Sequence, residues 1–356
     1  MSIPTAVFLD TSVFDGQSYN LSSTAFSTFV PACKQRNLKL LLPDPTEREV
    51  KRHMAERSDE ALAFIDKARR KAPFLAQWRG FPPRDSNVTS LRIPATPQSP
   101  PILRREVSEV AAIEWQNFLN QFDVVRLNYE GVSLPKVMNW YDAVEPPFDK
   151  GEKRKEFPDA FAIAILSAYA EQHRCYVAVV SQDTDLKKAC DRFLSLMYFH
   201  SLPFLTELLL SAEDSRIGTL RAILDSSIDK IAEAAYEEAA SDLSFYGNND
   251  YSEIRESEVR DLKISDMRIV ALGGHECTIA FDAVIRVAHE VEWFEPGPAG
   301  QPERHDATAT EDYDVSGTAK VSLDEKTHAL LSVPSVVLDV EEIEAITVPP
   351  FWRHWR

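Results

Sequence analysis

Residues 156–166 constrain the fold more than any other part of the chain. Their sequence, EFPDAFAIAIL, places Pro158 ahead of a run of Ala, Ile and Leu. Proline fits the first turn of a helix, and a helix that is apolar on nearly every side must lie inside a core. The segment therefore predicts a buried helix that carries the carboxylate of Asp159 in its first turn.

Short apolar segments elsewhere predict the strands of a parallel sheet. Brief runs of this kind are typical of central strands that helices cover on both faces. The segments are 5–9 (TAVFL), 38–42 (LKLLL), 124–127 and 176–181 (YVAVVS), with 197–200 as an edge strand. Helical patterns occupy 22–35, where Pro31 should kink or split the helix, and then 104–120, 133–141 and 202–210. The predicted fold class is α/β.

Another helix is expected to begin at Asp44-Pro45-Thr46-Glu47. Asp44 is the predicted N-cap, Pro45 suits the first helical position, and Glu47 stands three residues after the cap. This interpretation gives Glu47 a structural role as a capping residue. It leaves Glu49, two residues further on, without one.

Four carboxylates stand at strand ends or helix starts: Asp10, Glu49, Asp159 and Asp183. Each alone has a structural interpretation, because Asp is a preferred helix cap and acids in a first turn complement the helix dipole. Ligands of open α/β sheets bind at the carboxyl ends of the strands, so we expect the four to converge there. Converging carboxylates call for a divalent cation.

The length of 356 residues predicts two domains, and the hydrophobic periodicity changes near residue 251. Residues 1–212 form the predicted α/β domain, with an irregular Pro-, Ser- and Arg-rich insertion at about 73–101. Residues 213–248 are predicted to be a helical connector. From 249 to 356 polar and apolar residues alternate around Gly273-Gly274, which predicts a small antiparallel β domain with a hairpin.

The charge is distributed unevenly. The chain carries a net charge of −17, but residues 250–350 hold 22 Asp and Glu against 8 Lys and Arg, a balance of −14 that leaves only −3 for the rest. The nearly neutral first part can therefore act on a polyanion. The acidic β domain is expected to bind a protein partner, to mediate self-association, or to restrict access to the site, and not to bind nucleic acid by itself.

Several classes of protein are disfavoured. No apolar run is long enough to cross a bilayer and no signal-like leader is present, so we expect a soluble, cytoplasmic protein with no membrane partner. The four cysteines are widely spaced, which favours reduced thiols over a disulfide framework or structural zinc. The chain lacks GxxxxGK(S/T), GxGxxG, GxSxG and HExxH motifs, which argues against nucleotide hydrolases, Rossmann cofactors, serine hydrolases and zincins.

With strand, acid, helix, acid, buried helix with acid, strand and acid in this order, the N-terminal part resembles the PIN-domain nucleases. The matching segments are FLDTSVF, EREVKRH, EFPDAFAIAIL and VVSQDTDL, and the resemblance covers roughly residues 5–210. The segment from Trp140 to Ile163 is similar to a PIN-like subgroup of larger bacterial proteins, which tends to carry a β-rich C-terminal extension. The long insertion departs from the family pattern.

The resemblance implies an acidic centre and a set of substrate contacts. Its catalytic and metal-binding positions fall on Asp10, Glu49, Asp159 and Asp183, with Asp185 as an auxiliary metal ligand. Thr11 and Ser181 match hydroxyl residues of the family beside the first and last acids. Basic side chains near these acids are candidates for binding substrate phosphates. They are Arg48, Lys51, Arg52, Lys153, Arg154 and Lys155.

The chemistry follows from the residue types. Carboxylates without histidine or cysteine partners select Mg²⁺ or Mn²⁺ over zinc, and such ions promote hydrolysis of phosphodiesters. The predicted function is a metal-dependent endoribonuclease, with RNA as the substrate that the family implies. Two alternatives remain: a catalytically silent PIN fold that serves as an RNA-binding or assembly scaffold, and a structure-specific DNA nuclease.

Overall fold

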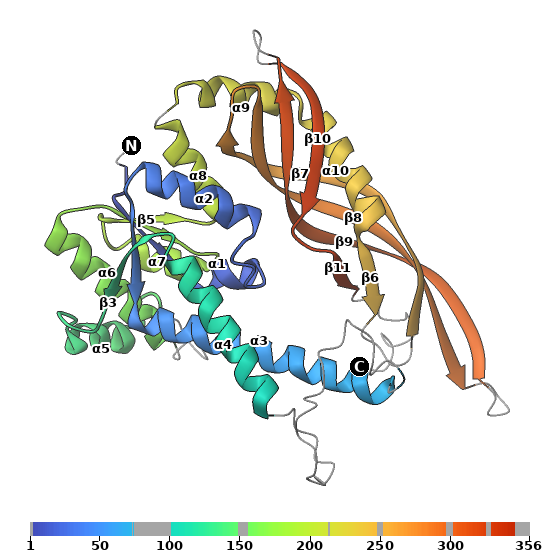
Figure 1. Ribbon diagram of the computed structural model, residues 1–356, viewed down its shortest axis with the longest axis horizontal. Coiled ribbons are helices and arrows are strands. Elements are labelled where there is room, and N and C mark those ends of the chain that lie inside the picture. Colours follow the sequence, from blue (N-terminus) through green and yellow to red (C-terminus); the bar gives the residue numbers. More distant parts are fainter. Residues whose placement is uncertain are drawn as a thin grey trace. The chain divides into compact units, whose positions relative to one another are not determined.

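The computed structural model describes residues 3–72, 74, 101–148, 156–212, 214–247, 252–296, 302–324 and 329–345. Most of the predicted insertion and the basic residues Lys153, Arg154 and Lys155 lie outside these ranges. The chain forms two compact units (Figure 1). The first takes in the chain up to Leu21 and Cys33–His200, and the second takes in Ser22–Ala32 and the chain from Ser201 onward.

A five-stranded parallel sheet forms the centre of the first unit and confirms the predicted α/β class. Its order is β3-β2-β1-β4-β5, so β1 lies in the middle, and Val7 of β1 pairs with Leu40 on one side and Ala178 on the other. Every residue of β1 and β4 is buried. The strands are β1 (Ala6–Leu9), β2 (Lys39–Pro43), β3 (Asp123–Leu127), β4 (Val177–Val180) and β5 (Leu196–Phe199).

Helices flank this sheet (Figure 1). The helix predicted from residues 156–166 is α6 (Phe157–His173); Pro158 lies in its first turn, and nine of its residues are buried. Because α6 is apolar on nearly every side, it contributes much of the hydrophobic core with β1 and β4. The other helices are α1 (Thr11–Gly16), α3 (Asp44–Lys71), α4 (Pro101–Leu119), α5 (Leu134–Ala143) and α7 (Thr184–Cys190).

The start of α3 differs from the prediction. Strand β2 runs directly into the helix, so that Pro43 is the N-cap and Asp44 is the first helical residue, with no side chain capping the helix. Asp44 instead pairs with Arg48 at 2.8 Å, and its charge complements the helix dipole. Residue Pro31 did not split its helix either, because α2 (Thr24–Gln35) continues through it.

The second unit contains the predicted antiparallel β structure. Its four-stranded sheet has the order β10-β9-β8-β7, and β7 and β8 are joined at Gly273, whose N–H donates to the carbonyl of Glu276 at 2.7 Å. The strands are β7 (Ser252–Leu272), β8 (Glu276–Pro296), β9 (Pro302–Leu323) and β10 (Leu330–Leu338). A separate parallel pair joins β6 (Ser244–Gly247) to β11 (Glu342–Ala345).

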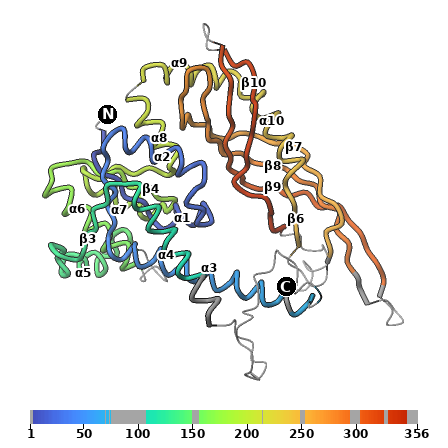
Figure 2. Tube along the Cα trace, in the orientation of Figure 1, coloured from blue at the N-terminus to red at the C-terminus, as the bar shows by residue number. Residues whose placement is uncertain are grey.

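Strand β7 is bulged at regular intervals. Four register shifts, after Ile254, Val259, Ile264 and Ile269, allow the 21 residues Ser252–Leu272 to pair with the 17 residues from Cys277 to Trp293. One extra residue in every five keeps an apolar side chain on the inner face while it increases the twist of the strand. Figure 2 shows the resulting curvature of β7, β8 and β9.

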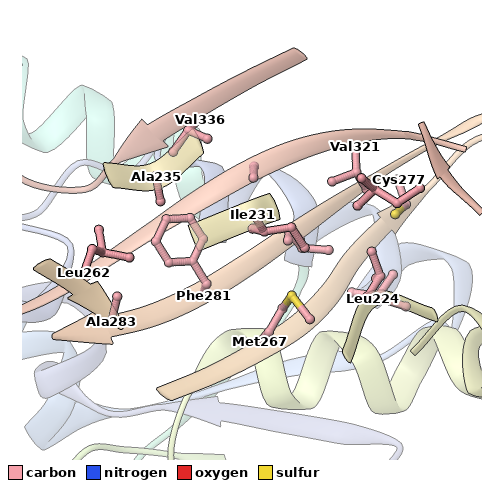
Figure 3. Close-up of a cluster of buried hydrophobic side chains, with 14 of the residues drawn as sticks. Leu224, Ile231, Ala235, Leu262, Met267, Cys277, Phe281, Ala283, Val321 and Val336 are labelled. Carbon is pink, nitrogen blue, oxygen red and sulfur yellow. The ribbon is translucent and has the colours of Figure 1, made fainter. Parts of the chain in front are cut away.

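The core of the second unit lies between this sheet and two helices (Figure 3). Leu224 of α9 (Arg216–Ser226) and Ile231 of α10 (Ile228–Asp242) are fully buried with Phe281 of the sheet. The segment predicted as a connector therefore forms part of this core. Helix α8 (Leu202–Ser211) is tied to β7 through Glu207, which accepts hydrogen bonds from Arg221 and from the N–H of Ile269.

Among the described residues, no helix combines the length and the apolar character needed to cross a bilayer. All four cysteines are free thiols. Cys33, Cys190 and Cys277 are buried, and burial raises the pKa of each thiol. These three thiols are therefore protonated core residues at neutral pH.

Candidate active site

Asp10 lies where β1 ends and caps the N-terminus of α1. Its side chain is 8% exposed, and its Oδ2 atom accepts hydrogen bonds from Ser12 Oγ at 2.5 Å and Ser181 Oγ at 2.8 Å. The N–H groups of Gln182 and Asp183 donate to these two hydroxyls. Because the backbone after β4 occupies their acceptor positions, both hydroxyls direct their protons at Asp10 and fix its orientation.

Glu49 is connected to Asp10 by a threonine. Thr11 Oγ1 lies 3.4 Å from Asp10 Oδ1 and 3.3 Å from Glu49 Oε2, so one buried hydroxyl stands between the two carboxylates. On its other oxygen, Oε1, Glu49 faces Arg52 Nη2 at 3.4 Å. Helix α3 thus brings Glu49 to the same place as the end of β1.

Asp159, in the first turn of α6, completes a cluster of carboxylates. Its pKa is raised to about 9, first by burial, then by a hydrogen bond with Glu156, and then by the charges of Asp10, Glu156 and Glu49. Such repulsion acts only between groups that lie close together. Asp10, Glu49 and Asp159 therefore share one charged site, with Glu156 as a fourth acid beside it.

The two acids after β4 take different positions. Asp183 caps α7 by accepting a hydrogen bond from the N–H of Asp185 at 2.7 Å, and it shares Ser181 with Asp10. Burial first, and then the charges of Asp183 and Asp10 among others, raise the pKa of Tyr198. Tyr198 therefore lies near both acids. Asp185 is 5% exposed and pairs with Lys188 on its own helix at 2.7 Å.

The described basic candidates are paired with acids of α3. Arg48 pairs with Asp44, Lys51 pairs with Glu47 at 2.7 Å, and Arg52 faces Glu49. Their side chains are more than half exposed, and such surface pairs contribute about 0–1 kcal/mol each.

Glu47 points away from the acidic cluster. Besides Lys51 it pairs with Arg126 of β3 at 3.3 Å. These three residues line a cavity of about 540 Å³ between α3 and α4, whose floor includes Met54 and Trp115. None of the four predicted catalytic acids lines this cavity.

The structure adds residues that the sequence interpretation omitted. Ser12 makes the shortest hydrogen bond to Asp10, and its position two residues after a strand-end acid is the signal that pointed to it. Glu156 precedes Asp159 by three residues, a spacing that brings side chains together on a helix. Thr11 and Ser181, predicted as substrate contacts, are buried against Asp10 and act on the position of that carboxylate.

The donor set has the chemistry of a site for a hard divalent cation. Carboxylate oxygens are the preferred ligands of Mg²⁺ and Mn²⁺, and the pKa of Asp159 is raised first by burial and then also by the neighbouring acids. As the side chains stand, no group of three or more acidic, histidine or cysteine residues in the described ranges forms a closed set of ligands. The residue types therefore fit a divalent cation, although the side chains are not arranged around one.

In open parallel sheets ligands bind at the carboxyl ends of the strands, and acidic side chains lie at this edge here. Comparison with known families matches the PIN domain over residues 7–186, half of the chain, and the match includes all the acids described above. The chain therefore belongs to the PIN-domain family, whose members are generally nucleases that use divalent metal ions. No curated protein and no solved structure matches it.

Proposed function

We propose that this protein is a metal-dependent endoribonuclease that hydrolyses phosphodiester bonds at the cluster of Asp10, Glu49, Asp159 and Asp183. The observation that carries the proposal is the convergence of Asp10, Glu49 and Asp159: Thr11 joins the first two, and the pKa of Asp159 is raised to about 9 by burial first, then by Glu156, and by the charges of Asp10 and Glu49. A fold rarely places like charges together unless a cation or a reaction uses them. Family membership supports the nuclease class.

The same acids would hold Mg²⁺ or Mn²⁺, with Asp185 as an additional ligand. When bound, such an ion activates a water molecule and neutralises the charge that develops on the phosphate oxygens. Ser12 and Ser181 would keep Asp10 oriented, and Thr11 would set the spacing between Asp10 and Glu49. Asp159, hydrogen-bonded with Glu156, would hold a proton at neutral pH until a cation takes the place of that proton.

Substrate phosphates would be bound by the basic residues around the site. Arg48 and Lys51 are exposed on α3, and their ion pairs are weak enough to exchange for a phosphate, while Arg52 would contact a phosphate without leaving Glu49. Lys153, Arg154 and Lys155 precede α6 in the sequence and carry the same role in the proposal. RNA is the proposed substrate because the family resemblance favours it over DNA.

The acidic second unit is assigned a role other than nucleic-acid binding. Its balance of −14 over residues 250–350 repels a polyanion, so we infer that it binds a protein partner or a second copy of the chain. Because all four cysteines are free, a reducing compartment suits the protein, and we place the reaction in the cytoplasm.

The test is cleavage of labelled RNA and DNA by the full-length protein with Mn²⁺ or with EDTA. Asp10→Asn keeps the shape of the side chain and removes its charge, while Asp142→Asn is the matched control on an exposed position of α5. We expect cleavage of RNA by the wild type and Asp142→Asn, and loss of cleavage with EDTA or Asp10→Asn. RNA binding without Mn²⁺-dependent cleavage would favour the scaffold, and cleavage of DNA alone would make DNA the substrate.

A further inference from the structure

A second cluster of side chains lies behind Glu49, between the end of α1 and the middle of α3. It contains Asp15, Tyr19, Arg52, His53 and Arg57. Tyr19 Oη lies 2.9 Å from His53 Nδ1, and His53 Nε2 lies 3.1 Å from Arg52 Nη2. The same Arg52 nitrogen is 3.4 Å from Glu49 Oε1. A continuous set of contacts thus leads from Tyr19 to a carboxylate of the candidate site.

The guanidinium of Arg52 sets the direction of the hydrogen bonds in this cluster. A guanidinium can only donate, so His53 Nε2 accepts from Arg52 and the ring hydrogen is on Nδ1. His53 Nδ1 then faces Tyr19 Oη at 2.9 Å and Asp15 Oδ2 at 3.3 Å, and the Tyr19 hydroxyl is itself hydrogen-bonded to Asp15. Arg57 Nη2 closes the set at 3.3 Å from Asp15 Oδ1. His53 Nε2 therefore keeps the guanidinium of Arg52 against Glu49 by offering it an acceptor.

The backbone that presents Tyr19 is strained. Ser18 and Tyr19 both lie in the left-handed region, with φ of 48° and 58°, although neither is glycine. The turn is held by the N–H groups of Ser18 and Tyr19, which donate to the carbonyls of Asp15 at 2.8 Å and Phe14 at 2.9 Å. Each such residue costs about 1–2 kcal/mol, and strain of this kind is concentrated at functional sites. Here it directs a tyrosine hydroxyl at His53.

We propose that Tyr19 and His53 are positioning residues that orient Glu49 through Arg52. Glu49 is anchored on Oε2 by Thr11 and on Oε1 by Arg52, which is itself 58% exposed and is held besides by His53 and, at 3.5 Å, by Glu56. Groups behind a ligand fix its orientation, and their loss typically weakens metal binding about 10- to 100-fold. This inference rests on the proposed function, because it concerns how the chain prepares Glu49 to hold a cation.

The test is Mn²⁺ binding by the full-length protein, followed by electron paramagnetic resonance without any RNA. Tyr19→Phe removes one hydroxyl and keeps the ring, which stacks near Phe14 at 6.3 Å and under Arg57 at 5.3 Å. Tyr176→Phe, at a 42% exposed position, is the matched control. We expect the Mn²⁺ dissociation constant to rise about tenfold in Tyr19→Phe and to stay unchanged in Tyr176→Phe.

A pair of substitutions at His53 separates positioning from general stability. His53→Gln retains an amide that can donate and accept, whereas His53→Ala retains neither. We expect His53→Ala to weaken Mn²⁺ binding at least as much as Tyr19→Phe does. His53→Gln should recover part of the lost Mn²⁺ affinity. Saturating Mn²⁺ should restore kcat on RNA without a change in KM.

Two results would overturn the inference, and they are distinguishable from failure of the proposed function. If the wild type binds Mn²⁺ and both Tyr19→Phe and His53→Ala bind it equally well, the cluster only joins α1 to α3. If melting temperatures fall while Mn²⁺ affinity does not, the same conclusion follows. A wild type that binds no Mn²⁺ would refute the metal centre itself, and the inference with it.

Discussion

The two units of this protein use carboxylates in opposite ways. In the sheet of the second unit, acids face arginines: Glu292 lies 2.5 Å from Arg255 and 2.6 Å from Arg304, and two hydrogen bonds from Arg286 lower the pKa of Asp312. In the first unit, Asp10 and Asp159 pair with no cation among the described side chains, and the pKa of Asp159 is raised. The site is thus marked by acids that have no cationic partner among the described side chains. In the more acidic second unit, Glu292 and Asp312 are neutralised by arginines.

The largest effect expected from this comparison is on catalysis. Asp159→Asn should lower RNA cleavage at saturating Mn²⁺ by about 10³-fold or more, because removing one charged group from a preorganised site typically has an effect of that order. Asp312→Asn should leave cleavage unchanged. Equal activity of the two variants in a single-turnover assay would refute the contrast between unpaired acids at the site and arginine-paired acids in the second unit.

A second expected effect concerns the stability of the sheet. Glu292→Gln leaves two arginines facing a neutral side chain that is 4% exposed. Because both arginines remain about half exposed, the loss should be about 1–2 kcal/mol of the free energy of unfolding, below the value for a fully buried pair. Urea denaturation measures it, and an unchanged midpoint would show that the pairs contribute nothing.

The third expected effect is on the pH dependence of stability without metal. The folded-state pKa of Asp159, about 9, is above the value near 4 in the unfolded chain, so the folded state holds an extra proton between these values. Apo stability should therefore fall as pH rises from about 4 to 9. Asp159→Asn should flatten this slope and gain about 1–2 kcal/mol at pH 8. A marked loss of stability in the variant would identify Asp159 as a structural cap.

A smaller effect is expected from the outer face of the second unit. Glu290, Asp306 and Asp314 are exposed there, on strands β8 and β9. Neutralising all three should raise kcat/KM for RNA about two- to threefold at low salt and have no effect at about 0.5 M salt, where charges are screened. A gain that persists at high salt would point to direct contacts with RNA.

The smallest effect is expected at the strained turn after α1. Ser18→Gly relieves a left-handed conformation without removing a side-chain contact to His53, and should stabilise the protein by about 0.5–1 kcal/mol. Thermal denaturation can resolve this change. A loss of stability would mean that Ser18 makes contacts that outweigh the strain.

Much of the fold of the first unit was predictable because its signals are local. The uniformly apolar α6 and the short runs of β1 and β4 can only be buried, and the sheet follows from their order. The start of α3 was mispredicted, since the capping pattern of Asp44 and Glu47 competes with a strand that continues to Pro43. The bulges of β7 were not predictable, because an extra residue in a strand interrupts the alternation of polar and apolar residues without a local signal of its own.

The site was predictable in its acids and not in the groups that hold them. Asp10, Glu49 and Asp159 follow from positions at strand ends and helix starts, which sequence order reveals. Ser12 and Glu156 do carry a local signal, because they stand two residues after Asp10 and three residues before Asp159. The contact between Tyr19 and His53 joins residues 34 apart in the sequence and depends on a strained turn, so sequence patterns carry no local signal for it.

The most direct test of the metal centre is the proton released when Mn²⁺ binds. At pH 7.5 Asp159 is protonated, so titration calorimetry in two buffers of different ionisation enthalpy should show release of about one proton per bound ion. Asp159→Asn should bind Mn²⁺ weakly and release none, while Asp312→Asn should behave as the wild type. Absence of Mn²⁺ binding by the wild type, or equal binding and proton release by Asp159→Asn, would contradict the account.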